Sequence, residues 1–292
     1  MTILPSIISS GSKRPREVGH TNFPELRSKL SIRYPNMIVP DHDDVVDVNA
    51  ERLVVTFVGN HFARKGGCVV LRVAEKAHEA GLPVDFHVVS TLVRGKTVWS
   101  DPVRLGFFDQ YLKLLELPNV VFSRGLPNKQ VVDLLQRSHF SLLPTFSDTF
   151  GYGSIESMMN YTPVIATKLQ AIPEFVVHDE TGILVETDCT PDGDWVGTRV
   201  GDKSTTQFEA TFATAVDDLA EQVYAALVGC VNDRAKIARL RSAARHKAVA
   251  LFDSRPASMW WDDLYERVAS CSAPTAAGRS GRIGEVRSRA GG

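Results

Sequence analysis

The stretch from residue 140 to residue 167 constrains the fold of this chain more than any other. It holds two short apolar runs, at 140–143 and 163–167, and such runs are typical of strands buried on both faces of a sheet. Between them lie a polar, glycine-rich turn at 147–153 and a short segment that predicts a helix at about 154–160. Strand, helix and strand in so few residues favour one unit of a parallel α/β sheet.

The rest of the chain repeats this alternation. Further apolar runs predict strands at 53–59, 84–90, 119–125 and 183–186. Helical patterns lie between the strands at about 70–81, 107–116 and 129–137, and three longer helices follow at 209–230, 233–251 and 257–269. The order favours a doubly wound, Rossmann-like parallel sheet with C-terminal helices, which binds ligands beyond the carboxyl ends of its strands.

The 292 residues divide by composition into a central domain and two less regular ends. We expect residues 1–50 to be a partly disordered linker with one helix around 24–30, and residues 51–270 to form the domain. Residues 188–206 are rich in turn formers and predict a surface insertion. Residues 271–292 are rich in Gly, Ser, Ala and Arg, which predicts a disordered tail.

Charge and cysteine content narrow the class of protein. The formal net charge is −1, so no overall field favours nucleic acid or an anionic membrane. Four scattered cysteines, without a Cys/His cluster, fit free thiols better than disulfides or a metal site. The sequence has neither a signal-peptide pattern nor an apolar run long enough to span a bilayer. We therefore expect a cytoplasmic protein with no bound metal and no membrane span.

The turn at 147–153 has the features of an anion-binding site. A strand, a glycine-rich turn and a helix N-terminus leave backbone N–H groups free to point at a ligand. Two carboxylates, Asp148 and Glu156, bracket this turn. Carboxylates repel phosphate, so this pair suggests hydroxyl groups to bind, as on a sugar or a ribose. The spacing alone leaves open a structural alternative, in which Asp148 caps the turn and Glu156 complements the helix dipole.

A second turn follows the first predicted strand, from Gly59 to Gly67. It also lies between a strand and a helix start, a position suited to a diphosphate. Arg64 and Lys65 would donate charge-assisted hydrogen bonds to phosphate oxygens. Alone, two basic residues before a helix are more often simply solvated, and the turn gains meaning only beside the acidic pair.

Together these residues resemble the nucleotide-sugar site of family 4 glycosyltransferases, retaining enzymes of the GT-B fold also described as glycosyl transferases group 1. The resemblance rests on Asp148, Phe150, Gly151 and Glu156, followed by Thr-Pro-Val-Ile-Ala at 162–166 and Pro-Glu at 173–174. It extends to the earlier turn, where a Gly and five intervening residues are followed by Lys-Gly.

The resemblance implies a role for each of these positions. The substrate would be a nucleoside diphosphate sugar, used without a cofactor or metal. The first acid and nearby backbone would hold the donor sugar, the second acid the ribose, and Lys65 would neutralise the leaving diphosphate. The implied site comprises Lys65, Asp148 and Glu156, the phosphate- and donor-binding Gly59, Asn60, Arg64, Phe150, Gly151, Tyr152, Gly153 and Ser154, and a base-binding stretch of Arg124, Gly125 and Leu126.

Several positions depart from the family pattern. Asn60 replaces a basic residue, Asp148 replaces a longer Glu, and Thr149 replaces a Gly. A pair of small glycines before Pro-Glu is replaced by Gln170 and Ala171. These changes concern the donor sugar and catalysis more than the nucleotide.

The resemblance covers about residues 50–187, the donor half of such enzymes. The roughly fifty residues before it are too few for an acceptor domain, so we expect the acceptor site to come from another polypeptide or a homo-oligomer. The alternatives are a non-catalytic nucleotide-sugar-binding subunit and a truncated relic. A dehydrogenase is disfavoured, because the run Gly151-Tyr152-Gly153 has Glu156 where a dinucleotide fingerprint needs its third Gly.

Overall fold

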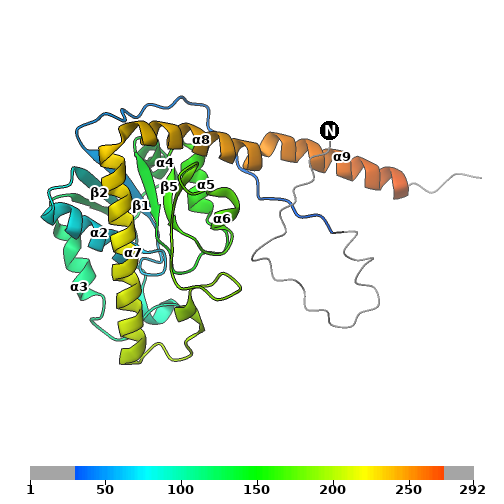
Figure 1. Ribbon diagram of the computed structural model, residues 1–292. Coiled ribbons are helices and arrows are strands. Elements are labelled where there is room, and N and C mark those ends of the chain that lie inside the picture. The colour runs from blue at the N-terminus through cyan, green and yellow to red at the C-terminus, as the bar shows by residue number, and fades with distance from the viewer. Residues whose placement is uncertain (1–29, 273–292) are drawn as a thin grey trace, which may run out of the picture. The chain divides into compact units, whose positions relative to one another are not determined.

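The computed structural model describes residues 30–272, and its centre is a six-stranded parallel sheet with helices on both faces (Figure 1). The strands are β1 (Leu53–Val58), β2 (Val84–Val89), β3 (Val120–Ser123), β4 (Phe140–Leu143), β5 (Val164–Thr167) and β6 (Gly182–Val185). Their order is β3-β2-β1-β4-β5-β6, and every neighbouring pair is parallel. The doubly wound sheet predicted from the sequence is confirmed, and each predicted strand is present.

This strand order contains one reversal of winding. From β1 the chain moves outward through β2 to β3, then returns to place β4 against the other side of β1. The segments that follow β1 and β4 therefore leave the same edge of the sheet side by side. In open α/β sheets such a reversal is the usual place for a ligand.

The helices lie close to their predicted positions. They are α2 (Gly67–Glu79), α3 (Asp109–Leu112), α4 (Asn128–Gln136), α5 (Tyr152–Met159), α6 (Ile172–Phe175), α7 (Thr206–Asn232), α8 (Arg234–Phe252) and α9 (Ser254–Ser272). The predicted helix at 107–116 is instead α3 followed by a 3₁₀ turn, Lys113–Glu116. Both α2 and α5 begin directly after a glycine with positive φ, so each starts a little earlier than predicted. No helix within residues 30–272 has the length and apolarity to cross a membrane.

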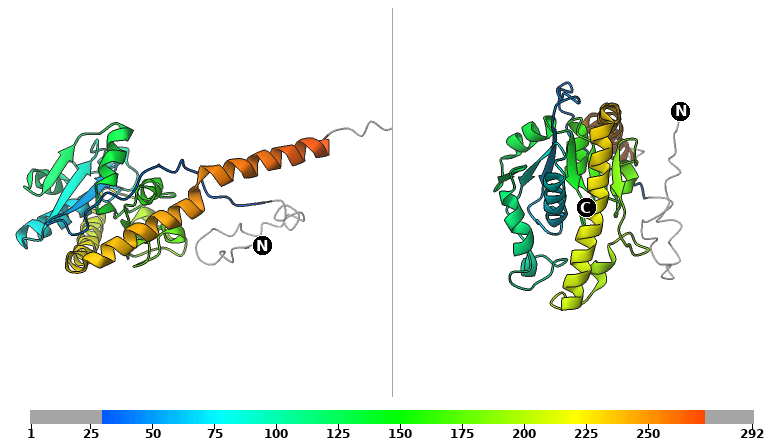
Figure 2. Two further views of the ribbon diagram at one scale, coloured as in Figure 1. Left: turned by 90° about the horizontal axis from the view of Figure 1, so that it is seen from above. Right: turned by 60° about the vertical axis from the view of Figure 1, so that its left-hand side comes forward.

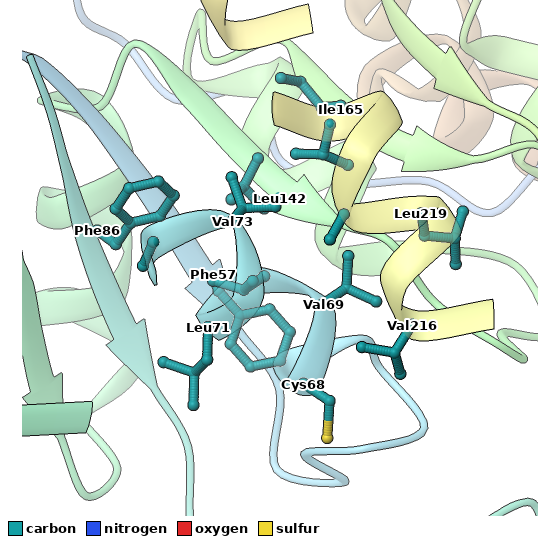
Figure 3. Close-up of a cluster of buried hydrophobic side chains, with 14 of the residues drawn as sticks. Phe57, Cys68, Val69, Leu71, Val73, Phe86, Leu142, Ile165, Val216 and Leu219 are labelled. Carbon is teal, nitrogen blue, oxygen red and sulfur yellow. The ribbon is translucent and has the colours of Figure 1, made fainter. Parts of the chain in front are cut away.

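Both faces of the sheet are buried, which explains why the strands read as continuous apolar runs. On β5, Ile165 packs into a core with α2 and α7, while Val164 and Ala166 face a second core with α5 and α8. Figure 3 shows the first core, where Val69 and Val73 of α2 lie between the sheet and α7. The right view of Figure 2 shows α2 and α7 side by side over that face.

Residues 30–50 contain no helix or strand but are tied to the domain. The fully buried guanidinium of Arg241, on α8, pairs with Asp44, and Arg245 donates a hydrogen bond to the carbonyl oxygen of Pro40 at 2.7 Å. Sequence reasoning assigned no packing to this segment. The helix predicted at 24–30 lies, apart from its last residue, outside the described residues, and so does nearly all of the predicted tail. By its contacts the chain up to Asp253 forms one compact unit and α9 belongs to another.

Candidate functional site

The turn after β1, residues 59–66, is closed by its own backbone. The N–H groups of Lys65 and Gly67 donate to the carbonyl oxygens of His61 and Phe62, at 2.9 and 2.7 Å. Gly66 has φ +92° and opens α2. A Cβ atom there would lie 2.1 Å from the carbonyl oxygen of Pro144. Only glycine allows this turn to sit directly against the chain that leaves β4.

The segment after β4 is bound to this turn through Arg64. The N–H of Phe146 donates to the carbonyl oxygen of Arg64 at 2.9 Å, and the Arg64 guanidinium donates to the carbonyl oxygen of Ser147 at 2.8 Å. The hydroxyl of Thr145 lies 2.9 Å from the same Arg64 carbonyl. The two segments that meet at the reversal of the sheet are thus interlocked by main chain and side chain.

Lys65 and Asp148 form an ion pair across these two segments. Their side chains are 23% and 10% exposed, so the pair is far less screened than a surface pair. The second carboxylate oxygen of Asp148 accepts the N–H of Gly151 at 3.1 Å. The sequence placed both residues in one site, and the structure brings them into direct contact.

The N-terminus of α5 supplies free donors beside this pair. Gly151 precedes the helix with φ +82°. The N–H of Gly151 is used by Asp148, and that of Ser154 donates to the Gly151 carbonyl oxygen at 2.8 Å. Within residues 30–272 the N–H groups of Tyr152 and Gly153 have no protein acceptor. Two of the four amides assigned to this helix start are therefore available to a ligand.

The hydroxyl of Ser154 is a further polar group at this helix start. Ser154 is 1% exposed, and its Oγ atom has no hydrogen-bond partner among the described residues. Phe150, just before the helix, is partly buried, and its ring lies against Phe175 with centroids 5.8 Å apart. Tyr152 points outward and is 57% exposed.

Glu156 lies elsewhere, toward the start of α4. Its carboxylate accepts a hydrogen bond from the side-chain amide of Asn128 at 3.2 Å. Asn128 follows closely on the predicted base-binding stretch, in which Gly125 has φ +81°, Arg124 is exposed and Leu126 packs beside the start of α4. The acidic pair is therefore split: Asp148 meets Lys65, whereas Glu156 lies toward residues 124–126.

The segment after β2 braces the β1 turn, which sequence reasoning missed. Val93 donates its N–H to the carbonyl oxygen of Asn60 at 3.0 Å and accepts that of Phe62 at 2.8 Å. The guanidinium of Arg64 donates to Nδ1 of His61 at 2.7 Å. Burial, and then the charges of Arg64 and Lys65, lower the pKa of His61. His61 is therefore a neutral acceptor that orients Arg64.

The predicted insertion also reaches the site. Most of residues 188–206 are exposed, but Trp195 is 1% exposed and its ring packs against Phe146 with centroids 4.8 Å apart. The side-chain amide of Gln170 donates to Asp194 at 2.6 Å. A lone tryptophan in a turn-rich segment, and a glutamine in place of a glycine, were the only sequence signals for these contacts.

The arrangement suits a ligand that carries both phosphate and hydroxyl groups. Arg64, Lys65 and two free amides converge at a helix N-terminus, which favours negative charge. Asp148 beside them is an acceptor only, and one of its oxygens already accepts the N–H of Gly151. If Lys65 turned to a phosphate, the other oxygen would be left to accept from a hydroxyl group.

Comparison with known proteins gives independent evidence on the class of protein. Residues 40–192 match the family model described as glycosyl transferases group 1. One relative, D-inositol 3-phosphate glycosyltransferase of Rhodococcus erythropolis, is 30% identical over 152 residues, which are 50% of this chain and 32% of the relative. The chain spans about a third of the length of the curated relatives it matches.

Solved glycosyltransferase structures share the fold. Sucrose-phosphate synthase of Thermosynechococcus elongatus matches with a TM-score of 0.51 and 20% identity, over 76% of this chain and 47% of that one. Anabaena HepE, solved in complex with UDP-glucose, matches with a TM-score of 0.50 and 17% identity, over 76% and 50%. These likenesses establish a shared α/β sheet domain of the GT-B type.

Proposed function

The chain belongs to the glycosyl transferases group 1 family, and on this premise we propose that its sheet domain is the donor-binding half of a retaining glycosyltransferase of the family 4 type. The donor would be a nucleoside diphosphate sugar. The observation that carries the proposal is the contact between Lys65 and Asp148 at the reversal of the sheet. It joins a group suited to phosphate with a group suited to a sugar hydroxyl.

The diphosphate is assigned to the space between the β1 turn and the N-terminus of α5. Lys65 and Arg64 would contact its oxygens from one side, and the free N–H groups of Tyr152 and Gly153 from the other. When the bond between the anomeric carbon and the diphosphate breaks, its electron pair passes to the phosphate oxygen. Donors already aimed at that oxygen stabilise the developing charge most in a partly buried site.

The sugar is assigned to the side of Asp148 and the ribose to the side of Glu156. A donor entering the site would exchange partners: Lys65 leaves Asp148 for a phosphate oxygen, and Asp148 accepts a sugar hydroxyl instead. Glu156 would accept the ribose hydroxyls, with the base near residues 124–126. The contact of Glu156 with Asn128, close to that stretch, supports this order.

The acceptor side of the reaction is assigned to residues outside the sheet domain, whether in the same polypeptide or in a partner. Transfer requires the acceptor hydroxyl and the anomeric carbon to be held in near-attack geometry. One sheet edge supplies the donor side only. We propose that the protein works in the cytoplasm, where nucleotide sugars are made, and needs no metal.

A thermal-shift panel of UDP-, GDP- and ADP-sugars tests the donor site. A ligand that binds only the folded state adds about 2.7 kcal/mol of stability at a hundredfold excess over its dissociation constant. We expect one nucleotide class, with UDP-glucose as the first to try, to raise the melting temperature. Lys65→Ala and Glu156→Ala should abolish the rise, and Lys113→Ala, at an exposed lysine on another element, should not. No rise with any nucleotide sugar would refute the proposal.

A non-catalytic nucleotide-sugar-binding subunit is the second candidate. Asn60 and Asp148, which depart from the pattern that the sequence resembles, favour it. Catalysis depends on Lys65 more than binding does, because charge develops on the diphosphate only as the bond breaks. An unchanged biological activity of Lys65→Ala in its native setting would favour the binding subunit over the enzyme.

A further inference from the structure

Residues 188–206, the insertion, contact both segments that bound the sugar side of the proposed site. These are the segment after β4, which carries Asp148, and the segment after β5, which carries Gln170. Most of the insertion lies beyond the stretch that matches the family model, which ends at residue 192. The residues of the insertion that contact the site, from Gly193 onward, therefore lie outside the part of the chain that matches the family model.

The first contact is made by Trp195. Its ring packs against Phe146, two residues before Asp148, and both are essentially fully buried. Phe212 of α7 completes the cluster, with its ring centroid 4.8 Å from that of Phe146. A Cβ atom on Gly197 would lie 2.2 Å from the Trp195 ring, so a glycine there leaves room for the indole.

The second contact is made at Gln170. Its side-chain amide donates to Asp194 at 2.6 Å, and its backbone N–H donates to the carbonyl oxygen of Gly193 at 3.1 Å. Asp194 also pairs with Arg199 at 2.8 Å. Gln170 adopts φ +48°, a conformation that costs a non-glycine residue energy. The bonds to the insertion offset that cost.

We infer that the insertion is a positioning element for the donor sugar, acting through Trp195 on the Asp148 segment and through Asp194 on Gln170. The inference rests on the proposed function. It also accounts for Gln170, at a position where the family pattern has a small glycine. The Gln170 side chain connects the segment after β5 to the insertion. Trp195 and Gln170 are positioning residues and touch no reacting atom.

The effect should fall on the sugar and spare the nucleotide. The phosphate side of the site is formed by the β1 turn against Pro144 and by the helix starts, and among the described residues no hydrogen bond joins the insertion to either. The insertion reaches that side only indirectly, through Phe146, whose N–H donates to the carbonyl oxygen of Arg64. Asp148 is the proposed sugar contact, and it lies on the segment that Trp195 holds. Losing the insertion's contacts should therefore reduce discrimination between a nucleotide sugar and its free nucleoside diphosphate.

The test is the ratio of dissociation constants for UDP and UDP-glucose, or for the GDP or ADP pair that the thermal-shift panel selects, measured calorimetrically on the full chain. We expect Trp195→Ala and Gln170→Gly each to reduce the preference for the nucleotide sugar about tenfold, equivalent to about 1.4 kcal/mol. Affinity for the free nucleoside diphosphate should change less than about twofold in both, because its contacts lie on the other side. Trp195→Phe, which keeps an aromatic ring against Phe146, should retain most of the preference.

Val223→Ala is the matched control, because it removes buried methyl groups from the middle of α7 and lowers stability without involving the insertion. It should leave the ratio unchanged. If Gln170→Gly and Trp195→Ala lower the melting temperature but keep the wild-type ratio, the insertion is merely structural and the inference is wrong. Equal weakening of both ligands also refutes it. Should Trp195→Ala not fold, Gln170→Gly decides the question. A wild-type protein that binds neither ligand refutes the proposed function instead.

Discussion

The two segments that meet at the reversal of the sheet look alike but are held in different ways. The β1 turn ends in Gly66 and the β4 segment in Gly151, each with φ near +90° and each opening a helix. At Gly66 a Cβ atom would collide with main chain, the Pro144 carbonyl oxygen. At Gly151 it would lie 3.2 Å from a methylene of Ile172, a side chain that can move.

The difference separates a rigid half of the site from an adjustable half. The β1 turn is shaped by close backbone contacts, which allow only one conformation. The β4 segment is held by side-chain contacts of Asp148 with Lys65, of Arg64 with the Ser147 carbonyl oxygen and of Trp195 with Phe146, and the two polar contacts can exchange partners. A fixed turn suits a diphosphate common to all donors. A segment held by side chains can be tuned to one sugar.

The largest expected effect comes from breaking the rigid half. Gly66→Ala should lower the free energy of unfolding by more than about 3 kcal/mol, because the added methyl group has no space and the backbone angle is unfavourable. Gly81→Ala is the matched control, since Gly81 has φ +65° and nothing within 4 Å. It should cost only about 1 kcal/mol for the backbone angle. Equal losses in urea denaturation would show that packing against Pro144 does not shape the turn.

The next largest effect is expected from Asp148→Asn, which should weaken binding of the nucleotide sugar but not of the free nucleoside diphosphate. Asp148→Asn removes the charge that holds Lys65 and replaces one of the two acceptor oxygens of the carboxylate with an NH₂ donor. We expect UDP-glucose, or the donor that the panel selects, to bind about 10- to 100-fold more weakly, as loss of a hydrogen bond to a charged group predicts. The free nucleoside diphosphate should bind as well as before or better, because Lys65 no longer has to leave a partner. Calorimetry on both ligands checks this, and equal weakening would contradict the exchange.

A smaller effect is expected at the adjustable half itself. Gly151→Ala should cost about 1–2 kcal/mol of stability, mostly from its positive φ, since Ile172 can move aside. The loss should be clearly less than for Gly66→Ala in the same denaturation experiment. A loss as large as that of Gly66→Ala would mean that both segments are equally rigid, and the contrast between the halves would fail.

Much of the rigid half could be predicted from the sequence, because it depends on local patterns. Apolar runs that end in glycine and are followed by a helix predict both the strands and the turns at their carboxyl ends. The assignment of Gly59 and Lys65 to one site with Asp148 and Gly151 came from the resemblance to family 4 glycosyltransferases. Their assigned roles in binding stay predictions.

The contacts between distant segments could not be predicted in either half, because they join residues far apart in the chain. Trp195 packs on Phe146, and Val93 bonds to the turn at Asn60, with nothing in either local pattern to pair them. The packing of residues 30–50 against the domain was not predicted, for the same reason. Asp44 reads as one more polar linker residue, and only the fold shows that it neutralises a buried Arg241.

The smallest expected effect is a pH dependence within the rigid half. Burial and the nearby charges of Arg64 and Lys65 lower the pKa of His61 below its ordinary value, so the free protein keeps this ring neutral to lower pH than usual. A bound diphosphate adds negative charge that opposes the shift and raises the pKa again. Between the pKa of the free protein and the higher pKa of the complex, binding should take up a fraction of a proton, and affinity should rise as the pH falls through that interval.

The uptake can be measured by calorimetry at pH 6 in buffers of different ionisation enthalpy. His61→Gln should reduce it, while His246→Gln, at an exposed histidine of α8, should leave it unchanged. Part of the uptake will come from the ligand's own phosphate, so the difference between wild type and His61→Gln is the informative quantity. Protonation would also take Nδ1 from Arg64 and free that guanidinium for the phosphate. No difference between the two proteins would mean that His61 only orients Arg64 and does not sense the ligand.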